Sequence, residues 1–381
     1  MTGSLDSDLA HAAALAGLPG MTPVRLARSL DGFTPVSAWS AIRAGTHPAD
    51  EKRRFAPAAR TMDVESVGHG YVEAGIAVLV PGRPAYPTAL IGDPGAPAVL
   101  FARGNPGVLD RTPRVAVVGT RSATHYGRQV AAELGADLAG EGITVVSGLA
   151  LGIDAAVHTG VVRGGSTGTA PPVAVVGTGL DEVYPSANKD LWESVAGTGV
   201  ILSESPLGTK PRPGVFPARN RIIAALSDVV VIVESHLRGG SLYTAEAAAR
   251  RSIPVCAVPG SVRSPSSAGT NALLVDGCIP VRDATDVIVA LGLVCAGRGE
   301  APPAVPPRSR QTSGIRHEPT VAGREMKASQ RAVWQAVEDT PTVFETVLLR
   351  SGLSTTEAAL ACEQLVVAGA LVEGSGWWTK A

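Results

Sequence analysis

Two arginines stand close together ahead of an apolar run in the segment FPARNRIIAALSDVVVIVES. Two guanidinium groups this near to each other repel, and burying either one without a counter-charge is costly. An anionic ligand would offset both charges. Arg219 and Asn220 are therefore predicted to face a phosphate group. Arg221 starts the apolar helix and is predicted to pair with a carboxylate, either Glu204 or Glu234.

Glycine and hydroxyl residues follow several other apolar runs and are typical of loops that hold anions. Glycine lets the backbone approach a ligand closely, and the N-terminus of a following helix attracts negative charge. The loop GTRSATHYG lacks the GxGxxG spacing of a dinucleotide site, so neither NAD nor another cofactor is expected. The alternative for its arginine is an ordinary surface position on a strand–helix turn. Besides Arg219 and Asn220, the residues predicted to contact an anionic ligand are Gly119, Arg121, Ser122, Gly148, Gly177, Gly179, Lys189, Phe216, Arg221, Gly240, Ser241 and Thr244.

Asp154 and His158 stand four residues apart in the segment SGLALGIDAAVHTG. A carboxylate and an imidazole at this spacing share one face of a helix and could bind a metal ion or move a proton. Two ligands are too few for a metal site, so no metal is expected. The favoured interpretation is structural, with Asp154 capping the helix and His158 hydrogen-bonded within it.

Apolar strands alternating with helical segments between residues 75 and 293 would position these loops. Near-continuous β-branched runs separated by helices predict a parallel sheet covered on both faces, which is a doubly wound, Rossmann-like α/β domain. Ligands of such sheets bind beyond the carboxyl ends of the strands. The predicted strands are 76–80, 98–101, 115–119, 143–147, 173–177, 200–204, 229–233 and 255–258.

Positive charge gathers on the same loops, although the whole chain has a net charge of −1. Residues 111–294 contain 15 Lys/Arg and 15 Asp/Glu. A focused positive patch on a neutral body, beside several anion-holding turns, predicts a phosphodiester chain as the ligand rather than one phosphate. The basic residues of these loops are Arg121, Arg128, Lys189, Lys210, Arg212, Arg219, Arg221 and Arg238.

Aromatic residues make up only 4% of the chain, so extensive base stacking is not expected. Phe216 and Tyr126 are the two aromatic residues expected near the patch. The alternative for Phe216 is packing beneath its own loop.

The N-terminal segment, residues 1–70, is predicted to form a helical domain, and residues 71–296 the Rossmann-like domain. The stretch GLPGMTP reads as a turn between two helices, with Pro23 opening the second. It lacks the second glycine typical of DNA-binding helix-hairpin-helix motifs, which argues against DNA contact of that kind. No apolar run approaches the ~18 residues of a membrane span. The four cysteines are widely spread, as expected of a cytoplasmic protein.

The C-terminal part has a different composition. Residues 297–324 are rich in Pro, Gly, Ser and Arg and are predicted to be a flexible linker. Residues 325–381 predict three helices followed by a two-stranded wing, which is the outline of a winged helix. This module has four Lys/Arg and seven Asp/Glu, a net charge of −3, and its third helix has no basic residue. We therefore expect it to bind protein, or to pack on the core, rather than to grip duplex DNA.

Six motifs in a fixed order resemble those of the DNA-processing protein A (DprA/Smf) family. They are VAVVGTRSATHYG, VVSGLALGIDAAVH, VAVVGTGLDEVYP, FPARNRIIAALSDVVVIVE, GGSLYTAEAA and VPG. The likeness extends from Tyr86 to Leu293 and includes the leading segment YPTALIGDPGAPAVLFARGN.

The resemblance implies an extended Rossmann-like domain that binds single-stranded DNA, with a helical domain before it and a winged helix after it. It also implies a homodimer through the Rossmann-like domain, and loading of RecA recombinase onto DNA in natural transformation. By position it assigns phosphate contacts to Arg121, Arg219 and Asn220, and a basic contact to Lys189. The departure RGGSLYTA places Arg238 and Gly239 where relatives have a small residue before the turn.

Two other functions remain as alternatives to a non-enzymatic single-strand binder. One is a nucleotide phosphoribohydrolase of the lysine-decarboxylase-like group, whose PGGxGTxxE motif is approached by RGGSLYTAE with Glu246 as its carboxylate. Leu242 and Tyr243 replace the glycine and threonine of that motif. The other is a duplex-binding regulator that uses the winged helix, against which the charge of that module argues.

Overall fold

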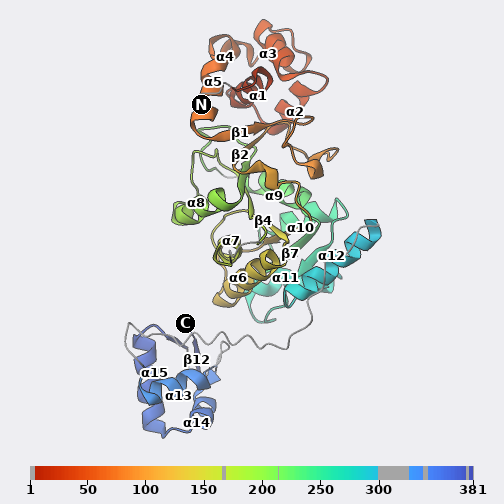
Figure 1. Ribbon diagram of the computed structural model, residues 1–381. Coiled ribbons are helices and arrows are strands. Elements are labelled where there is room, and N and C mark those ends of the chain that lie inside the picture. The colour runs from red at the N-terminus through yellow and green to blue at the C-terminus, as the bar shows by residue number, and fades with distance from the viewer. Residues whose placement is uncertain are drawn as a thin grey trace. The chain divides into compact units, whose positions relative to one another are not determined.

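The computed structural model describes residues 5–164, 169–212, 214–298, 326–337, 342–374 and 377–380. The chain folds into two compact units, Met1–Pro307 and Arg308–Ala381 (Figure 1). Among the described residues no helix is both long and apolar enough to cross a bilayer.

The first unit is built on a nine-stranded sheet with the order β1-β2-β6-β5-β4-β3-β7-β8-β9. The pairs from β6 to β9 are parallel, and helices follow most of these strands, as a doubly wound fold requires. The α/β fold expected from the sequence is thus confirmed. The strands are β1 (Ile76–Leu79), β2 (Leu100–Gly104), β3 (Arg114–Val118), β4 (Thr144–Ser147), β5 (Val173–Val176), β6 (Val200–Ser203), β7 (Val229–Ile232), β8 (Val255–Ala257) and β9 (Ile279–Pro280).

One edge of the sheet differs from the predicted parallel pattern. Strand β2 runs antiparallel to both β1 and β6. No crossover α-helix separates β1 from β2, and neighbouring strands without such a helix pair antiparallel. The apolar pattern identified these strands but carried no information on their direction. The two-residue strand β9 was too short to be predicted.

Helices cover both faces of the sheet. Val115 and Val117 of β3 pack in a core with α6, α7 and α12, whereas Ala116 and Val118 point to the opposite face, where α9 and α10 pack. This alternation follows from the two-residue period of a strand. The helices after β3 are α6 (His125–Gly140), α7 (Ile153–Arg163), α8 (Lys189–Thr198), α9 (Val215–Ala225), α10 (Leu242–Ala249), α11 (Ala268–Val275) and α12 (Ala284–Arg298).

The N-terminal segment is helical, as predicted, and packs against the β1–β2 end of the sheet (Figure 1). Tyr71 stacks on Phe101 of β2 with ring centroids 4.9 Å apart. The boundary predicted at residue 70 falls within the last helix of the segment, and a separate N-terminal domain stays a prediction. The helices are α1 (Ser7–Gly17), α2 (Pro23–Leu30), α3 (Pro35–Ala44), α4 (Ala56–Thr61) and α5 (Val64–Glu73).

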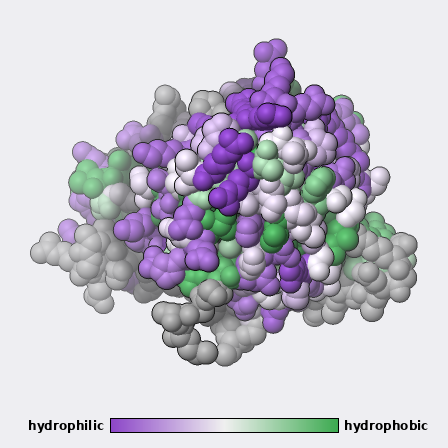
Figure 2. Space-filling view, turned by 90° about the horizontal axis from the view of Figure 1, so that it is seen from above, coloured by the Kyte–Doolittle hydropathy of each residue, from purple (hydrophilic) through white to green (hydrophobic). Residues whose placement is uncertain are grey.

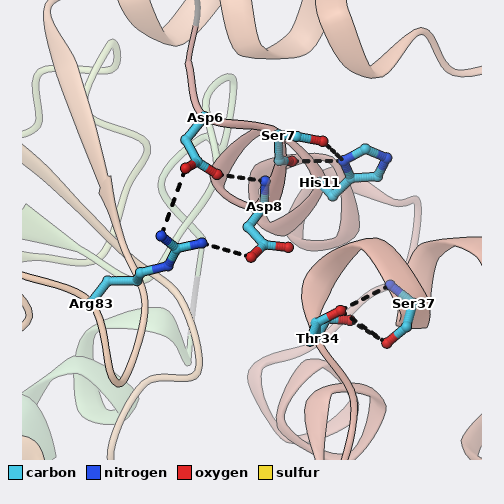
Figure 3. A network of polar contacts seen from close by, with 7 residues as sticks. All are labelled: Asp6, Ser7, Asp8, His11, Thr34, Ser37 and Arg83. Atoms are coloured by element: carbon cyan, nitrogen blue, oxygen red, sulfur yellow. Dashed lines mark hydrogen bonds and ion pairs between the residues drawn. The ribbon is translucent and has the colours of Figure 1, made fainter.

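Arg83, which follows β1, joins the sheet to the start of α1 (Figure 3). Its Nη2 donates to Oδ2 of Asp8 at 2.7 Å, and its Nη1 lies 3.7 Å from Oδ2 of Asp6. Seen from above, this end of the molecule is mostly hydrophilic, with hydrophobic residues in small separate groups (Figure 2). The predicted turn between helices is confirmed, because α2 begins at Pro23 and the Thr22 side chain caps it.

The second unit contains the three helices and the two wing strands predicted for residues 325–381, together with a short strand, β10, where the second helix was predicted to begin. They are α13 (Ala328–Ala336), β10 (Thr342–Val343), α14 (Phe344–Ser351), α15 (Thr355–Val367), β11 (Leu371–Gly374) and β12 (Trp377–Lys380), with the sheet order β10-β12-β11. The predicted capping box of Ser354 and Glu357 opens α15. The order of helices and strands agrees with a winged helix, and that assignment stays a prediction. The predicted linker, 297–324, lies outside the described residues except for the last two residues of α12.

Candidate nucleic-acid interface

Helix α9 begins earlier than the sequence suggested. It starts at Val215, so Arg219, Asn220 and Arg221 lie inside the helix and not ahead of it. Pro217 falls in the first turn, where a missing backbone N–H costs nothing because that turn has no intrahelical acceptor. The early start places Arg219 on the side of α9 that is turned toward the sheet.

Arg219 is buried, with 6% of its surface exposed. Its Nη1 donates to the carbonyl oxygen of Gly148 at 2.7 Å and to that of Val175, and its Nη2 lies 3.9 Å from Oδ2 of Asp154. Burial lowers the pKa of this guanidinium to about 10, with Asp154 acting in the opposite direction. Carbonyl oxygens and a carboxylate of the protein therefore surround the Arg219 guanidinium, where the sequence analysis expected a phosphate. A phosphate contact of Arg219 stays a prediction.

Asp154 links two loops beneath the surface. It lies in the first turn of α7, and its carboxylate accepts backbone hydrogen bonds from Gly119 after β3 and Ala150 after β4. Burial raises its pKa, which Arg219 and these N–H groups partly offset. The predicted helix cap is wrong, because Gly152 takes that position. Asp154 instead holds the loops in place around the Arg219 guanidinium.

His158 is fully buried one turn further along α7. Neither of its ring nitrogens makes a hydrogen bond of normal geometry within the described part of the chain, and the backbone of Ser147 is the group that favours its charged form. Burial, together with the nearby Arg219, lowers its pKa to about 3. His158 is therefore neutral at physiological pH. No group of three or more His, Cys, Asp or Glu residues suited to a metal ion occurs within the described part of the chain.

Two of the predicted glycines are needed for contacts within the protein. A Cβ on Gly148 would come 2.2 Å from Nη1 of Arg219, and a Cβ on Gly119 would come 2.5 Å from a side-chain carbon of Ile153. These positions accept only glycine because other parts of the protein occupy the space. These two glycines, predicted to let the loop backbone approach a ligand, are thus required for packing the loops against other parts of the protein.

A cleft opens at the carboxyl edge of the sheet, above this buried pair. It consists of a cavity of about 370 Å³ and a smaller one of about 60 Å³, and both are lined by Arg121, Ala150, Phe216 and Arg219. The loops after β3, β4 and β7 and the first turns of α9 and α10 form its walls. Of the predicted residues, the cleft brings together Gly119, Arg121, Gly148, Gly177, Phe216, Arg219, Asn220, Gly240, Ser241 and Thr244.

Arg121 and Phe216 form the boundary between the two cavities. The Arg121 guanidinium lies 4.6 Å from the centroid of the Phe216 ring, and Tyr184 packs near the same ring at 5.5 Å. Arg121 is exposed, so its charge faces solvent over an aromatic surface. Phe216 is only partly buried. Tyr126, the second aromatic residue expected here, instead donates a hydrogen bond to the carbonyl oxygen of Pro259.

Two hydrogen bonds set the rim of the larger cavity. Asn220 Nδ2 donates to the carbonyl oxygen of Gly240 at 3.2 Å, which ties α9 to the loop before α10. Nε2 of His236 lies 3.3 Å from the hydroxyl of Ser122. His236 and Tyr184 line the cleft and were not predicted. Their positions in the loops that follow β7 and β5 were the available signal, since the loops after the strands were already expected to form the site.

The remaining predicted residues lie outside the cleft lining. Arg221 forms an ion pair of 2.5 Å with Glu204, which confirms the pairing expected from the sequence. Gly179 packs against the loop before α9, and Lys189 is exposed at the start of α8. Of the other basic residues of the predicted patch, Arg238 lines the larger cavity, whereas Lys210 and Arg212 line a separate groove.

Comparison with known proteins identifies the family. The model of the DNA recombination-mediator protein A family matches residues 77–292, which is more than half of the chain. The chain belongs to this family. Protein Smf of Synechocystis is 32% identical over 319 residues, covering 78% of each chain. DNA processing protein DprA of Bacillus subtilis is 36% identical, covering 58% of this chain and 73% of the relative.

Solved structures of the family share the fold. DNA processing protein A of Streptococcus pneumoniae superimposes with a TM-score of 0.62 at 30% identity, covering 75% of this chain and 98% of that protein. The protein from Helicobacter pylori, described for its single-stranded DNA binding mode, has a TM-score of 0.50 at 32% identity, covering 57% and 95%.

Proposed function

We propose that the cleft binds single-stranded DNA. The observation that carries this proposal is the exposed guanidinium of Arg121 stacked on Phe216 at the mouth of the cleft. A cation beside an aromatic face suits the two features that every nucleotide of a strand presents, a phosphate and a base. Neither feature depends on the base sequence, so binding should be largely independent of sequence.

The surrounding groups favour a strand over an isolated phosphate. The first turn of α10 and its preceding glycines face the larger cavity, and a helix N-terminus attracts phosphate. The smaller cavity is lined by Leu151, Val176 and Tyr184, which are suited to apolar contact. A phosphate and a base can therefore be held in neighbouring cavities. The relative from Helicobacter pylori supports this assignment by its description as a single-stranded DNA binder.

We further propose, from family membership, that the bound strand is delivered to RecA recombinase in natural transformation or recombination. In this proposal the protein acts in the cytoplasm as a homodimer through its Rossmann-like part, and the C-terminal unit contacts protein rather than duplex DNA.

The experiment that tests DNA binding is a titration of labelled oligo-dT, and of a duplex of equal length, at several salt concentrations. We expect the single strand to bind more tightly, with a log–log salt slope of about −0.7 for each phosphate neutralised. Preference for the duplex would contradict the proposal. Delivery to RecA is tested separately by the rate of RecA filament assembly on DNA, with and without this protein.

The phosphoribohydrolase alternative loses its main support in the structure. Glu246, the carboxylate on which it depended, is exposed and pairs with Arg250 at 2.6 Å. It is not among the residues that line the cleft. Incubation with nucleoside monophosphates, followed by assay for free base, is the direct measurement, and we expect no release.

A further inference from the structure

We propose that a second groove on the first unit binds the continuation of the same polyanionic strand, an inference that rests on the proposed binding of DNA in the cleft. The groove has a volume of about 490 Å³. One wall is the turn from α1 to α2, residues 16–26, and the other is the loop from Glu204 to Arg212 between β6 and α9. Neither wall belongs to the lining of the cleft.

Cations line one wall of this groove and adjoin the other. Lys210 and Arg212 line it from the loop before α9, and both are exposed. On the other side two arginines contact Gly20, a lining residue. Nη1 of Arg25 donates to the carbonyl oxygen of Gly20 at 2.8 Å, and Nη2 of Arg54 lies 2.8 Å from where a Cβ on Gly20 would stand. Two pairs of basic side chains from distant parts of the sequence are therefore found on the groove or against one of its lining residues.

These four charges lack ion-pair partners within the described part of the chain, where no carboxylate lies within 4.0 Å of them. Two carboxylates that contact the loop before α9 or lie on it are already engaged. Glu204 is paired with Arg221, and both carboxylate oxygens of Asp181 accept from the backbone N–H of Gly208. Two exposed cations that line the groove, with two more that contact Gly20, create a positive potential there because no carboxylate of the described residues pairs with them. Such a potential suits a polyanion rather than a neutral ligand.

The groove and the cleft have lining loops that are bonded to each other, which favours one extended strand as the occupant of both. Gly177 lines the smaller cavity of the cleft. Two residues later, the backbone N–H of Gly179 donates to the carbonyl oxygen of Thr209 at 2.9 Å. Thr209 and the adjacent Lys210 both line the groove. The loop that carries Lys210 is therefore hydrogen-bonded to the same loop after β5 that supplies Gly177 to the cleft.

The chemistry of the groove predicts contact with phosphates and not with bases. Its cationic side chains are flexible, and the rest of its lining is mostly glycine, proline, serine and threonine, which present no broad aromatic surface. Such side-chain contacts differ from those of a helix-hairpin-helix motif, in which the hairpin backbone contacts DNA. The missing second glycine in GLPGMTP argues against contacts of that second kind. Phosphate contacts extend the footprint of a strand and add salt dependence without adding sequence preference.

Strand length separates the groove from the cleft in an experiment. Affinity is measured by fluorescence anisotropy for oligo-dT of about 6 nucleotides, which fits one site, and of about 20 nucleotides, which exceeds it. The test variant is the double substitution Lys210→Ala with Arg212→Ala. The matched control is Arg111→Ala, which removes an exposed arginine before β3, at the opposite edge of the sheet.

We expect the double variant to bind the short strand with unchanged affinity and to bind the long strand several-fold more weakly than wild type. The log–log salt slope of its binding to the long strand should become less negative by about 1.4, which corresponds to two lost phosphate contacts. The Arg111→Ala control should match wild type on both strands. Adding Arg25→Ala should weaken long-strand binding further, which shows that both walls contribute.

Four results would overturn the proposal. If the double variant equals the control on both strands, the groove does not bind DNA, although the cleft does. If it weakens both strands equally, the two cations act within the cleft and not in a separate surface. If wild type binds neither strand, the proposed function fails and the groove proposal fails with it. Poly-glutamate is also tested as a ligand. If it binds wild type but not the Lys210→Ala, Arg212→Ala variant, and does not compete with either DNA strand, the groove is assigned to an acidic protein instead.

Discussion

Arg219 and Asp154 form a buried ion pair beneath the cleft, with Nη2 and Oδ2 3.9 Å apart and both side chains less than 10% exposed. The pair connects α9 to α7, and through the backbone bonds of Asp154 it also fixes the loops after β3 and β4. The cleft residues on those loops keep their positions because of this charge pair, which lies at the floor of the larger cavity. This pair governs the first prediction.

Asp154→Asn should strongly destabilise the first unit. The substitution keeps the size of the side chain but leaves the Arg219 charge buried without its partner, which typically costs about 3–5 kcal/mol. Urea unfolding followed by circular dichroism measures the change in the free energy of unfolding. Glu246→Gln is the control, because its exposed pair with Arg250 should contribute only about 0.3–0.5 kcal/mol. Equal, small losses in both variants would show that Arg219 does not depend on Asp154.

Gly148→Ala should displace the Arg219 guanidinium. The new Cβ would stand 2.2 Å from Nη1 and 2.4 Å from Cζ of that side chain, so the arginine or the loop must move. Overpacking of this kind costs about 1–3 kcal/mol of stability, and DNA binding should fall as the cleft changes shape. The matched control is Gly140→Ala at the end of α6, where nothing lies within 4 Å of the added atom. That control should be neutral or more stable by about 0.5–1 kcal/mol.

His158 should make stability depend on pH in the acid range. Its pKa is about 3 in the folded protein, below the unfolded value of 6.5, so the unfolded chain binds the proton more readily. Its contribution to stability is therefore complete above about pH 6.5 and is lost as the pH falls toward 3.

The measurement is urea unfolding of wild type and of His158→Leu between pH 4 and 7. We expect the free energy of unfolding to fall with decreasing pH more steeply in wild type, by up to 1.36 kcal/mol for each pH unit. Other titrating groups act equally in both proteins, so the difference in slope reports on His158. Parallel curves would contradict a buried, neutral histidine.

Arg121→Ala should weaken binding of all single strands alike. It removes one exposed cation, so the log–log salt slope should become less negative by about 0.7 if one phosphate contact is lost. Phe216→Ala should cost about 1–3 kcal/mol of binding free energy if a base stacks on the ring, with little change in salt slope. Fluorescence anisotropy on oligo-dT and on mixed sequences distinguishes the two effects. Arg111→Ala again serves as the control, and an equal loss in that variant would mean that only overall charge matters.

The second unit should contribute nothing to duplex binding. Its net charge of −3 and its third helix without basic residues provide few phosphate anchors. Lys380, one of its four basic residues, lies 5.2 Å from the ring of Trp334. A chain that ends at Pro307 should bind duplex and single-stranded DNA as the full chain does. A loss of duplex affinity with a smaller salt slope would show that the module grips DNA.

Local sequence determined the elements of this protein and the edge at which its site lies. Runs such as VAVVG and VVVIV are buried strands because β-branched residues pack well on a pleated sheet covered on both faces. The carboxyl ends of parallel strands share one edge, so the loops with Gly119, Arg121 and Gly240 had to lie there together. The pairing of Arg221 with Glu204 was also predictable, because a partly buried cation needs a counter-charge.

Only the tertiary structure decided which charges remain available for a ligand. Arg219 and Arg221 are two residues apart in α9, which corresponds to a rotation of about 200° around the helix. Arg219 therefore points toward the sheet and Asp154, whereas Arg221 points away and pairs with Glu204. The direction of β2 and the separation of Lys210 and Arg212 from the cleft also depend on contacts between distant segments. A sequence pattern carries the period of an element but not its neighbours in space, and those neighbours set the burial and the pairing of each charge.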